Sequence, residues 1–327
     1  MVGGVYALHR AGRIACLDTV RAVRGNLKAT FSICALDAAS GEIGCAVQSR
    51  YFAVGAVVPW AKAGVGAVAT QAAGVAAYGP RILALLEEGL GPDEAIERAL
   101  EGDEAREARQ LGVVTADGRS ASHTGTECLK WAGHRVGDGY AVQGNILAGE
   151  AVVTEMERAF LESSGSLAER LVAALEAGQA AGGDSRGQQS SAVVVEKVGA
   201  AGESREGLDR VCELRVEDHP EPIVELRRLV GIHLVWDALR RATAFHQPGR
   251  YAEGAAVLAE ALARRGEDAV LLYDLACFEC LAGDTAGALA HARRSLELDQ
   301  GLRAGMAADP DFAALAGDAG FRALVGS

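Results

Sequence analysis

The sequence predicts an α+β protein in two parts: a layered sandwich of helices and mostly antiparallel strands, then a region of helices alone. Between residues 30 and 230, strands, helices, strands, helices and strands follow one another in groups. Grouped elements favour antiparallel sheets covered by helices over the regular β–α alternation of a parallel sheet. Residues 231–327 show helical patterns only and contain an internal repeat. We therefore expect the domains 30–230 and 231–327, preceded by a leader at residues 1–29.

The first two strands form a hairpin. Residues 30–36 and 43–49 are rich in β-forming residues, and residues 37–42 between them are turn formers. Further strands are predicted at residues 64–71, 110–115, 119–123, 128–135, 139–145, 191–197 and 208–216. The small residues of the strand at 64–71 indicate close packing against a neighbouring layer.

Four helices are predicted within the sandwich. The first runs from about Pro80 to Glu88 and ends at Gly89, and the next begins with Pro92, which suits the first helical position. The other two cover residues 150–163 and 167–179, and a glycine-rich loop leads from them to the last strands.

The C-terminal helices repeat with a period of 34 residues. The repeated positions are Gly254, Leu258 and Ala261, then Ala288, Ala292 and Ser295. Small side chains there let antiparallel helices approach closely, and a 34-residue helix–turn–helix period is typical of tetratricopeptide repeats. Because about two repeats are recognisable, we expect a small tetratricopeptide-like unit, with a generic helical hairpin as the alternative.

Composition and charge argue against several functions. The 327 residues carry 32 Lys and Arg against 44 Asp and Glu, a net charge of −12. This balance disfavours nucleic-acid binding and docking on anionic membranes. Seven cysteines are scattered as in reduced thiols, and the basic leader lacks the pattern of a secretory signal. We expect a cytoplasmic protein without nucleic-acid or membrane partners.

Two motif-like stretches are set aside. Residues 64–69 fit the dinucleotide pattern GxGxxA, but the apolar run continues through the glycines as in a strand, whereas a true site needs a strand, a turn and a helix. Cys277 and Cys280 fit CxxC inside a predicted helix, without a second pair or nearby histidines. A nucleotide-linked enzyme remains a weaker alternative; we expect neither a metal nor another cofactor.

Seven motifs lie at residues 30–33, 49–60, 64–71, 131–139, 143–145, 182–190 and 218–220. Over roughly residues 30–235, these motifs resemble an uncharacterised prokaryotic family, domain of unknown function 1028. The resemblance implies membership of the N-terminal-nucleophile hydrolase superfamily, a four-layer αββα sandwich and hydrolysis of an amide-type bond. The family has no settled substrate.

The resemblance makes Thr30, the first residue of the first strand, the candidate nucleophile. In this superfamily the α-amine of that residue is the general base, and its reference pKa of ~7.7–8.0 suits the task. Thr30 follows Ala29 in the sequence, so its nitrogen is an amide. Three alternatives follow: residues 1–29 are removed, for example by self-cleavage at Ala29–Thr30; translation starts further along; or this copy is inactive.

Two more residues are candidate catalytic groups. Asn145, where a strand ends, together with the Gly144 N–H would suit an oxyanion hole, with a turn asparagine as the alternative. Asp184 could orient the amine, with an internal ion pair to Arg186 as the alternative.

Substrate-binding candidates are Ser49, Arg50, Gln71 and Arg186, polar or charged residues at strand ends or in the glycine-rich loop. Arg50 could hold a substrate carboxylate or keep the Thr30 amine unprotonated. His123 is expected to be a hydrogen-bonding residue at a strand end rather than an acid or base.

Two functions from different classes remain. The first is an amidohydrolase acting on a small-molecule or peptide amide. The second is a catalytically silent ligand-binding or scaffold protein whose C-terminal helices dock a protein partner. The oligomeric state is left open, with a homo-oligomer as one alternative.

Overall fold

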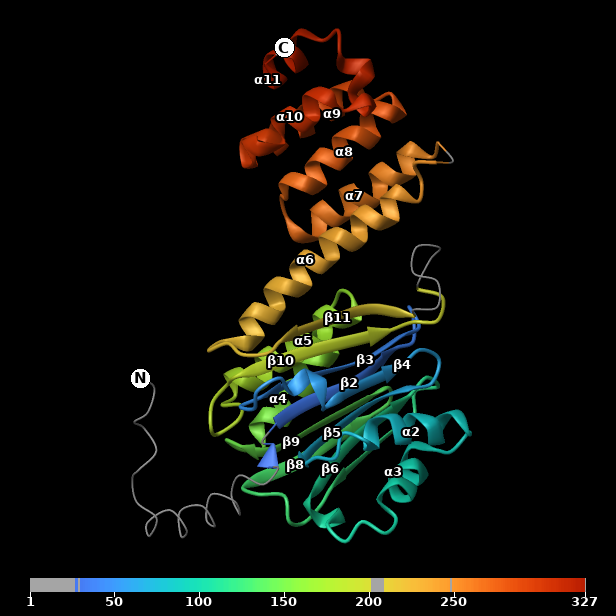
Figure 1. Cartoon of the computed structure of the whole chain (residues 1–327), viewed down its shortest axis with the longest axis vertical. Coiled ribbons are helices and arrows are strands. Elements are labelled where there is room, and N and C mark those ends of the chain that lie inside the picture. The colour runs from blue at the N-terminus through green and yellow to red at the C-terminus, as the bar shows by residue number, and fades with distance from the viewer. Residues whose placement is uncertain (1–26, 29, 201–208, 248, 327) are drawn as a thin grey trace, which may run out of the picture. The chain divides into compact units, whose positions relative to one another are not determined.

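The computed structural model describes residues 27–28, 30–200, 209–247 and 249–326 (Figure 1). The chain divides into two compact units at Val230/Gly231, a boundary that lies inside α6 (Pro222–Thr243). Apart from Leu27–Lys28, the expected leader lies outside the described residues.

The first unit contains two antiparallel sheets. The β5 sheet has the order β1 (Leu27–Lys28), β5 (Gly66–Ala73), β6 (Arg109–Thr115) and β7 (Ser120–Thr124), and β4 (Pro59–Lys62) also pairs with β5. The β2 sheet has the order β11 (Arg210–Val216), β10 (Ser190–Glu196), β3 (Glu42–Ser49), β2 (Thr30–Asp37), β9 (Tyr140–Leu147) and β8 (Trp131–Gly137). Strands β2 and β3 form the predicted hairpin, with Thr30 opposite Ser49.

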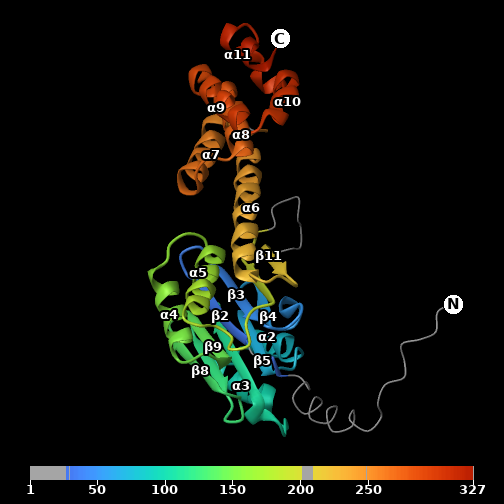
Figure 2. The same ribbon diagram turned by 90° about the vertical axis from the view of Figure 1, so that its left-hand side faces the viewer.

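Helices cover the outer side of each sheet, and the inner sides face each other (Figures 1 and 2). Helices α2 (Tyr78–Glu87) and α3 (Pro92–Leu100) pack on the β5 sheet, while α4 (Ala151–Glu162) and α5 (Leu167–Ala180) pack on the β2 sheet. The predicted α+β class with antiparallel strands is therefore confirmed.

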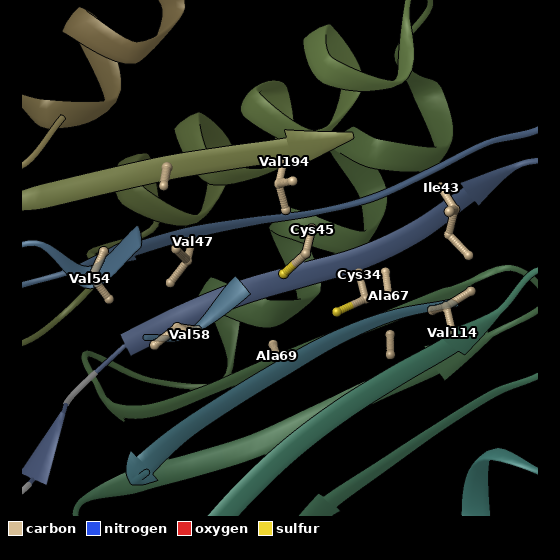
Figure 3. Packing of buried hydrophobic residues seen from close by; sticks show 12 residues of the cluster. Cys34, Ile43, Cys45, Val47, Val54, Val58, Ala67, Ala69, Val114 and Val194 are labelled. Atoms are coloured by element: carbon tan, nitrogen blue, oxygen red, sulfur yellow. The ribbon is translucent and has the colours of Figure 1, made fainter. Parts of the chain in front are cut away.

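An apolar core fills the space between the sheets (Figure 3). Cys34, Cys45 and Val47 of the β2 sheet meet Ala69 and Val114 of the β5 sheet, and all five are fully buried. Alternation along each strand sends the intervening residues to the helix layers. Burial on both faces explains why these strands are so apolar.

The GxGxxA stretch lies in a strand from Gly66 onward, whereas Gly64 and Val65, which were also predicted in the strand, belong to the preceding turn. Gly66 is the first residue of β5, and a Cβ there would come within 2.8 Å of Leu86 on α2. The absence of a side chain at Gly66 therefore lets α2 pack closely on β5. The stretch does not form the strand, turn and helix of a dinucleotide site. The sequence analysis missed β4, a short strand that begins at Pro59.

The second unit contains helices α7 (Tyr251–Arg265), α8 (Ala269–Ala282), α9 (Thr285–Leu298), α10 (Arg303–Ala308) and α11 (Ala319–Val325). A Cβ at Gly254 would lie 2.3 Å from the Phe278 ring, so the repeated small residue does mark a close approach of α7 and α8. Within the described residues no helix combines the length and apolar character needed to span a membrane.

Candidate functional site

Thr30 begins β2 in the interior of its sheet. It lies opposite Ser49 of β3 on one side and Asn145 of β9 on the other. Its side chain is fully buried, and its Oγ1 donates a hydrogen bond of 3.2 Å to Ser49 Oγ. Three residues from separate sequence motifs therefore meet at one end of the β2 sheet.

Gln71 joins this group from the facing sheet. Its Nε2 donates to the Thr30 carbonyl oxygen at 3.4 Å and to Gln110 Oε1 at 2.8 Å. The same Gln110 oxygen accepts a bond of 2.9 Å from Asn145 Nδ2. Gln110 thus ties two predicted site residues together, and all four side chains are at most 1% exposed.

The network continues inward through residues that the sequence analysis did not select. Ser32 Oγ donates to Gln71 Oε1 at 2.7 Å and accepts from Gln143 Nε2 at 2.6 Å. Gln110 Nε2 donates to the Gly144 carbonyl at 2.8 Å. We name the buried polar cluster by its members: Thr30, Ser32, Ser49, Gln71, Gln110, Gln143 and Asn145. Polar residues at alternate positions of apolar strands, as in Gln143 and Asn145, were the available signal.

The backbone is strained directly after two cluster residues. Ala72 follows Gln71 with φ of 64°, and Ile146 follows Asn145 with φ of 55°. The left-handed region is uncommon for residues other than glycine and is a marked outlier for a β-branched side chain. Strain of this kind gathers at functional sites.

Asn145 retains donor capacity. A side-chain amide carries two N–H groups, and Gln110 accepts one of those on Nδ2. The opposite atom, Asn145 Oδ1, is buried without a hydrogen-bond partner among the described residues.

Asp184, Arg50 and Arg186 form a second group next to Ser49. The Asp184 carboxylate accepts bonds from the Arg50 backbone N–H at 3.0 Å and the Arg186 backbone N–H at 2.8 Å. It also pairs with the Arg186 guanidinium at 3.0 Å, which is the ion pair the sequence analysis offered as an alternative. An isolated bridge to Leu147 links Asp184 to the end of β9.

Arg50 lines a cavity of about 310 Å³ with Gln188, Gln189, Asp218, His219 and Pro220. The cavity adjoins the site because the Gln189 N–H donates to the Ser49 carbonyl at 3.2 Å. A larger cavity of about 490 Å³ lies among the turns at the other end of β2, beside Leu36 and Gly41. It is remote from the buried polar cluster.

Lys28 and Thr30, two residues apart, belong to different sheets. Leu27 and Lys28 pair with Ala73 and Ala72 of β5, whereas Thr30 already belongs to the β2 sheet. Lys28 thus pairs with the residue that follows Gln71, at the end of the sheets where the buried polar cluster lies.

His123 lies outside the cluster, with Nε2 3.0 Å from the Arg106 carbonyl oxygen. This contact agrees with the predicted hydrogen-bonding role.

One group in the described residues has metal-ligand spacing: the Cys277 thiol and the carboxylates of Asp309 and Asp311, with ligand atoms within 4.8 Å of one another. Asp309 accepts bonds from the Tyr273 hydroxyl at 2.8 Å and the Asp311 N–H at 3.0 Å. Burial and the neighbouring Asp309 raise the pKa of Cys277 far above its usual range, so the thiol is neutral. Protein groups therefore donate to both oxygens of the Asp309 carboxylate.

Comparison with known proteins places the first unit in a family. No curated protein matches the chain. A crystal structure of a Silicibacter pomeroyi protein of the family DUF1028 is 30% identical, with a TM-score of 0.56; the match covers 62% of this chain and 88% of that one. The family of unknown function DUF1028 matches residues 30–226, more than half of the chain, and its match begins at Thr30. The chain belongs to this family.

Proposed function

We propose that the protein is an N-terminal-nucleophile amidohydrolase that cleaves a small amide or peptide-type bond with Thr30 as nucleophile. One observation carries the proposal: the family match begins at the residue that starts β2 within the buried polar cluster. Sequence similarity that starts at a strand-initial threonine is what a mature N-terminus at that residue would produce.

The architecture supports the proposal. Two facing antiparallel sheets, each with a helix pair on its outer side, agree with the αββα sandwich of the superfamily. The left-handed residues after Gln71 and Asn145 add support, since strain is retained where function requires it.

The mechanism needs a free α-amine at Thr30. That amine would take the proton from Thr30 Oγ1 as the oxygen attacks the amide carbonyl. The remaining N–H of Asn145 Nδ2 would donate to the oxyanion. The protonated amine would pass its proton to the leaving nitrogen, so that the C–N bond breaks and an ester to Thr30 remains. Water, deprotonated by the same amine, would then cleave the ester and release the acid.

The neighbouring residues have positioning and binding roles in this scheme. Ser49 holds the Thr30 hydroxyl, and Gln71 holds the Thr30 carbonyl. Asp184 fixes the backbone of Arg50 and pairs with Arg186, so Arg50 is the side chain best placed to meet a substrate carboxylate.

Intact mass and N-terminal sequencing of the purified protein test the proposal. We expect a mature chain that begins at Thr30, with hydrolysis of an amide library that Thr30→Ala abolishes and Thr30→Ser retains in part. Thr285→Ala, an exposed threonine in the second unit, is the matched control. A fully active preparation that always retains residues 1–29 would contradict the mechanism, because Thr30 would then lack its proton acceptor.

A second candidate function is a silent ligand-binding or scaffold protein. Thr30 is completely buried in the full-length chain, and this burial favours the second candidate. In this case we propose that α7 to α9 form tetratricopeptide-like repeats that bind an extended peptide. Full biological activity of Thr30→Ala would favour this candidate over the amidohydrolase.

A further inference from the structure

Two opposite charges face the 310 Å³ cavity beside Ser49. Arg50 supplies a guanidinium and Asp218 a carboxylate, and both side chains are exposed. Within the described ranges neither forms an ion pair with any residue, including the other. A cation and an anion that share a small cavity without neutralising each other can each pair with a ligand charge.

Separate tethers keep the two charges apart. Arg50 Nη1 donates to the Arg186 carbonyl at 2.6 Å, and Asp218 Oδ1 accepts from Gln189 Nε2 at 3.1 Å. Gly187 makes the first tether possible, because a Cβ there would lie 2.8 Å from Arg50 Nη1. Each tether occupies one polar atom of its side chain, which leaves the other guanidinium N–H groups and Asp218 Oδ2 for a ligand.

His219 adds a donor to the same wall. Its Nδ1 accepts a hydrogen bond of 3.0 Å from the Glu221 N–H, so the neutral ring carries its proton on Nε2. The His219 backbone N–H donates to the Gln189 carbonyl at 2.8 Å, and the Gln189 N–H in turn donates to the Ser49 carbonyl. These two bonds link His219 to Ser49.

We propose that this cavity binds the free α-amino-acid group of the substrate, with Arg50 on the α-carboxylate and Asp218 on the α-ammonium. A substrate with both groups free must carry its scissile amide in the side chain. The substrate class is therefore the side-chain amides of α-amino acids, a narrower class than amides in general. The inference rests on the proposed function for the cleavage step, but the binding step stands on the cavity alone.

The size and position of the cavity support this assignment. About 310 Å³ suits an amino-acid group rather than a folded peptide. Arg50 directly follows Ser49, whose Oγ accepts the Thr30 hydroxyl. The assignment requires the short side chain of a ligand held by Arg50 to extend from the cavity towards Thr30.

Isothermal titration of the full chain tests binding independently of catalysis. The probes are L-glutamine and L-asparagine, 5-amino-5-oxopentanoate, which lacks the ammonium, and 4-aminobutanamide, which lacks the carboxylate. We expect at least one of the two amino acids to bind at least tenfold more tightly than both truncated probes. Arg50→Met should weaken the carboxylate-bearing probes at least tenfold and spare 4-aminobutanamide, while Asp218→Asn should weaken the ammonium-bearing probes and spare 5-amino-5-oxopentanoate.

Arg293→Met, an exposed arginine in the second unit, is the matched control and should change nothing. Failure of both amino acids to bind, or binding of the amino acids by either the Arg50 or the Asp218 variant with unchanged affinity, would overturn the inference. Binding with the expected pattern but without any Thr30-dependent hydrolysis would instead overturn the proposed function and leave the ligand assignment standing.

Discussion

Gly112 on β6 lies directly against Gln143 on β9, across the interface of the two sheets. A Cβ at position 112 would come within 1.9 Å of Gln143 Oε1. That oxygen is buried without a hydrogen-bond partner among the described residues. Because Gly112 has no side chain, the Gln143 side chain fits between the sheets. The buried polar cluster therefore depends on a glycine at position 112.

Gly112→Ala should destabilise the protein by about 2–3 kcal/mol, because the added methyl forces Gln143 away from Ser32. Urea denaturation of the variant measures the loss. Combining it with Gln143→Ala should recover at least ~1 kcal/mol relative to the sum of the single changes. Gly149→Ala, where nothing lies within 4 Å of the new Cβ, is the control. Additive single effects would show that the two residues do not interact.

Gln110→Met should destabilise the protein, whereas Gln48→Met should not. The Gln110 amide forms hydrogen bonds with five protein groups, and its loss leaves buried polar atoms unpaired at a cost of about 2–4 kcal/mol. Gln48 is fully buried, and neither polar atom of its amide has a hydrogen-bond partner in the described part of the chain. Its replacement should be neutral or stabilise by ~1 kcal/mol. Chemical denaturation compares the two, and equal losses would contradict this reading.

Asp274→Asn should stabilise α8 above pH 6. Burial, then the charges of Asp309 and Asp311, raises the pKa of Asp274 to about 6. The carboxyl holds its proton more tightly in the folded state than in the unfolded state, where the pKa is ~3.9. The stabilisation that the raised pKa of Asp274 provides is therefore fully present below pH 4, where the carboxyl is protonated in both states. It declines as the pH rises from about 4 to 6.

The neighbouring charged and titratable groups are His246, which pairs with Asp311, and Cys277. Hydrogen exchange of the α8 amides should show a gain of up to ~2 kcal/mol for the variant at pH 8 and little gain at pH 4. An equal gain at both values would show that ionisation of Asp274 is not the cause.

Asp103→Asn should weaken the protein more at neutral pH than at pH 2.5. The Arg109 guanidinium at 2.8 Å, followed by the Tyr78 hydroxyl, holds the pKa of Asp103 well below its usual range. This stabilisation is present above the unfolded pKa of ~3.9 and is lost as the pH falls through the folded value. We expect a loss of about 2–4 kcal/mol at pH 7 because the half-buried Arg109 loses its partner.

Denaturation at pH 7 and at pH 2.5 tests the Asp103 prediction. Asp93→Asn, an exposed acid in the first turn of α3, is the control. A loss of the same size at both values would indicate a packing effect rather than an ionic one.

Periodicity and turn residues were enough to predict most strands and helices of the first unit. The hairpin of β2 and β3 was clear because turn residues separate two β-rich runs. Strand β4 was missed because a four-residue strand that starts with Pro59 carries little local signal.

The buried polar cluster could be predicted only in part. Thr30, Ser49, Gln71 and Asn145 were selected as strand-end residues or through the family resemblance, and the register brings them together. Gln110 was not selected, because its role depends on how β6 faces β9 across two sheets. Sequence patterns report which face of a strand is buried, but not which strand of another sheet lies opposite.

The crossing from β1 to β2 has a consequence for control under the proposed function. Lys28 pairs with one sheet and Thr30 with the other, so hydrolysis of the Ala29–Thr30 bond breaks the covalent link between the two sheets and creates the catalytic amine in one event. Peptide hydrolysis runs in one direction, so a molecule once switched on stays on. The amount of active enzyme would then depend on how many chains have been cleaved, not on how many have been synthesised.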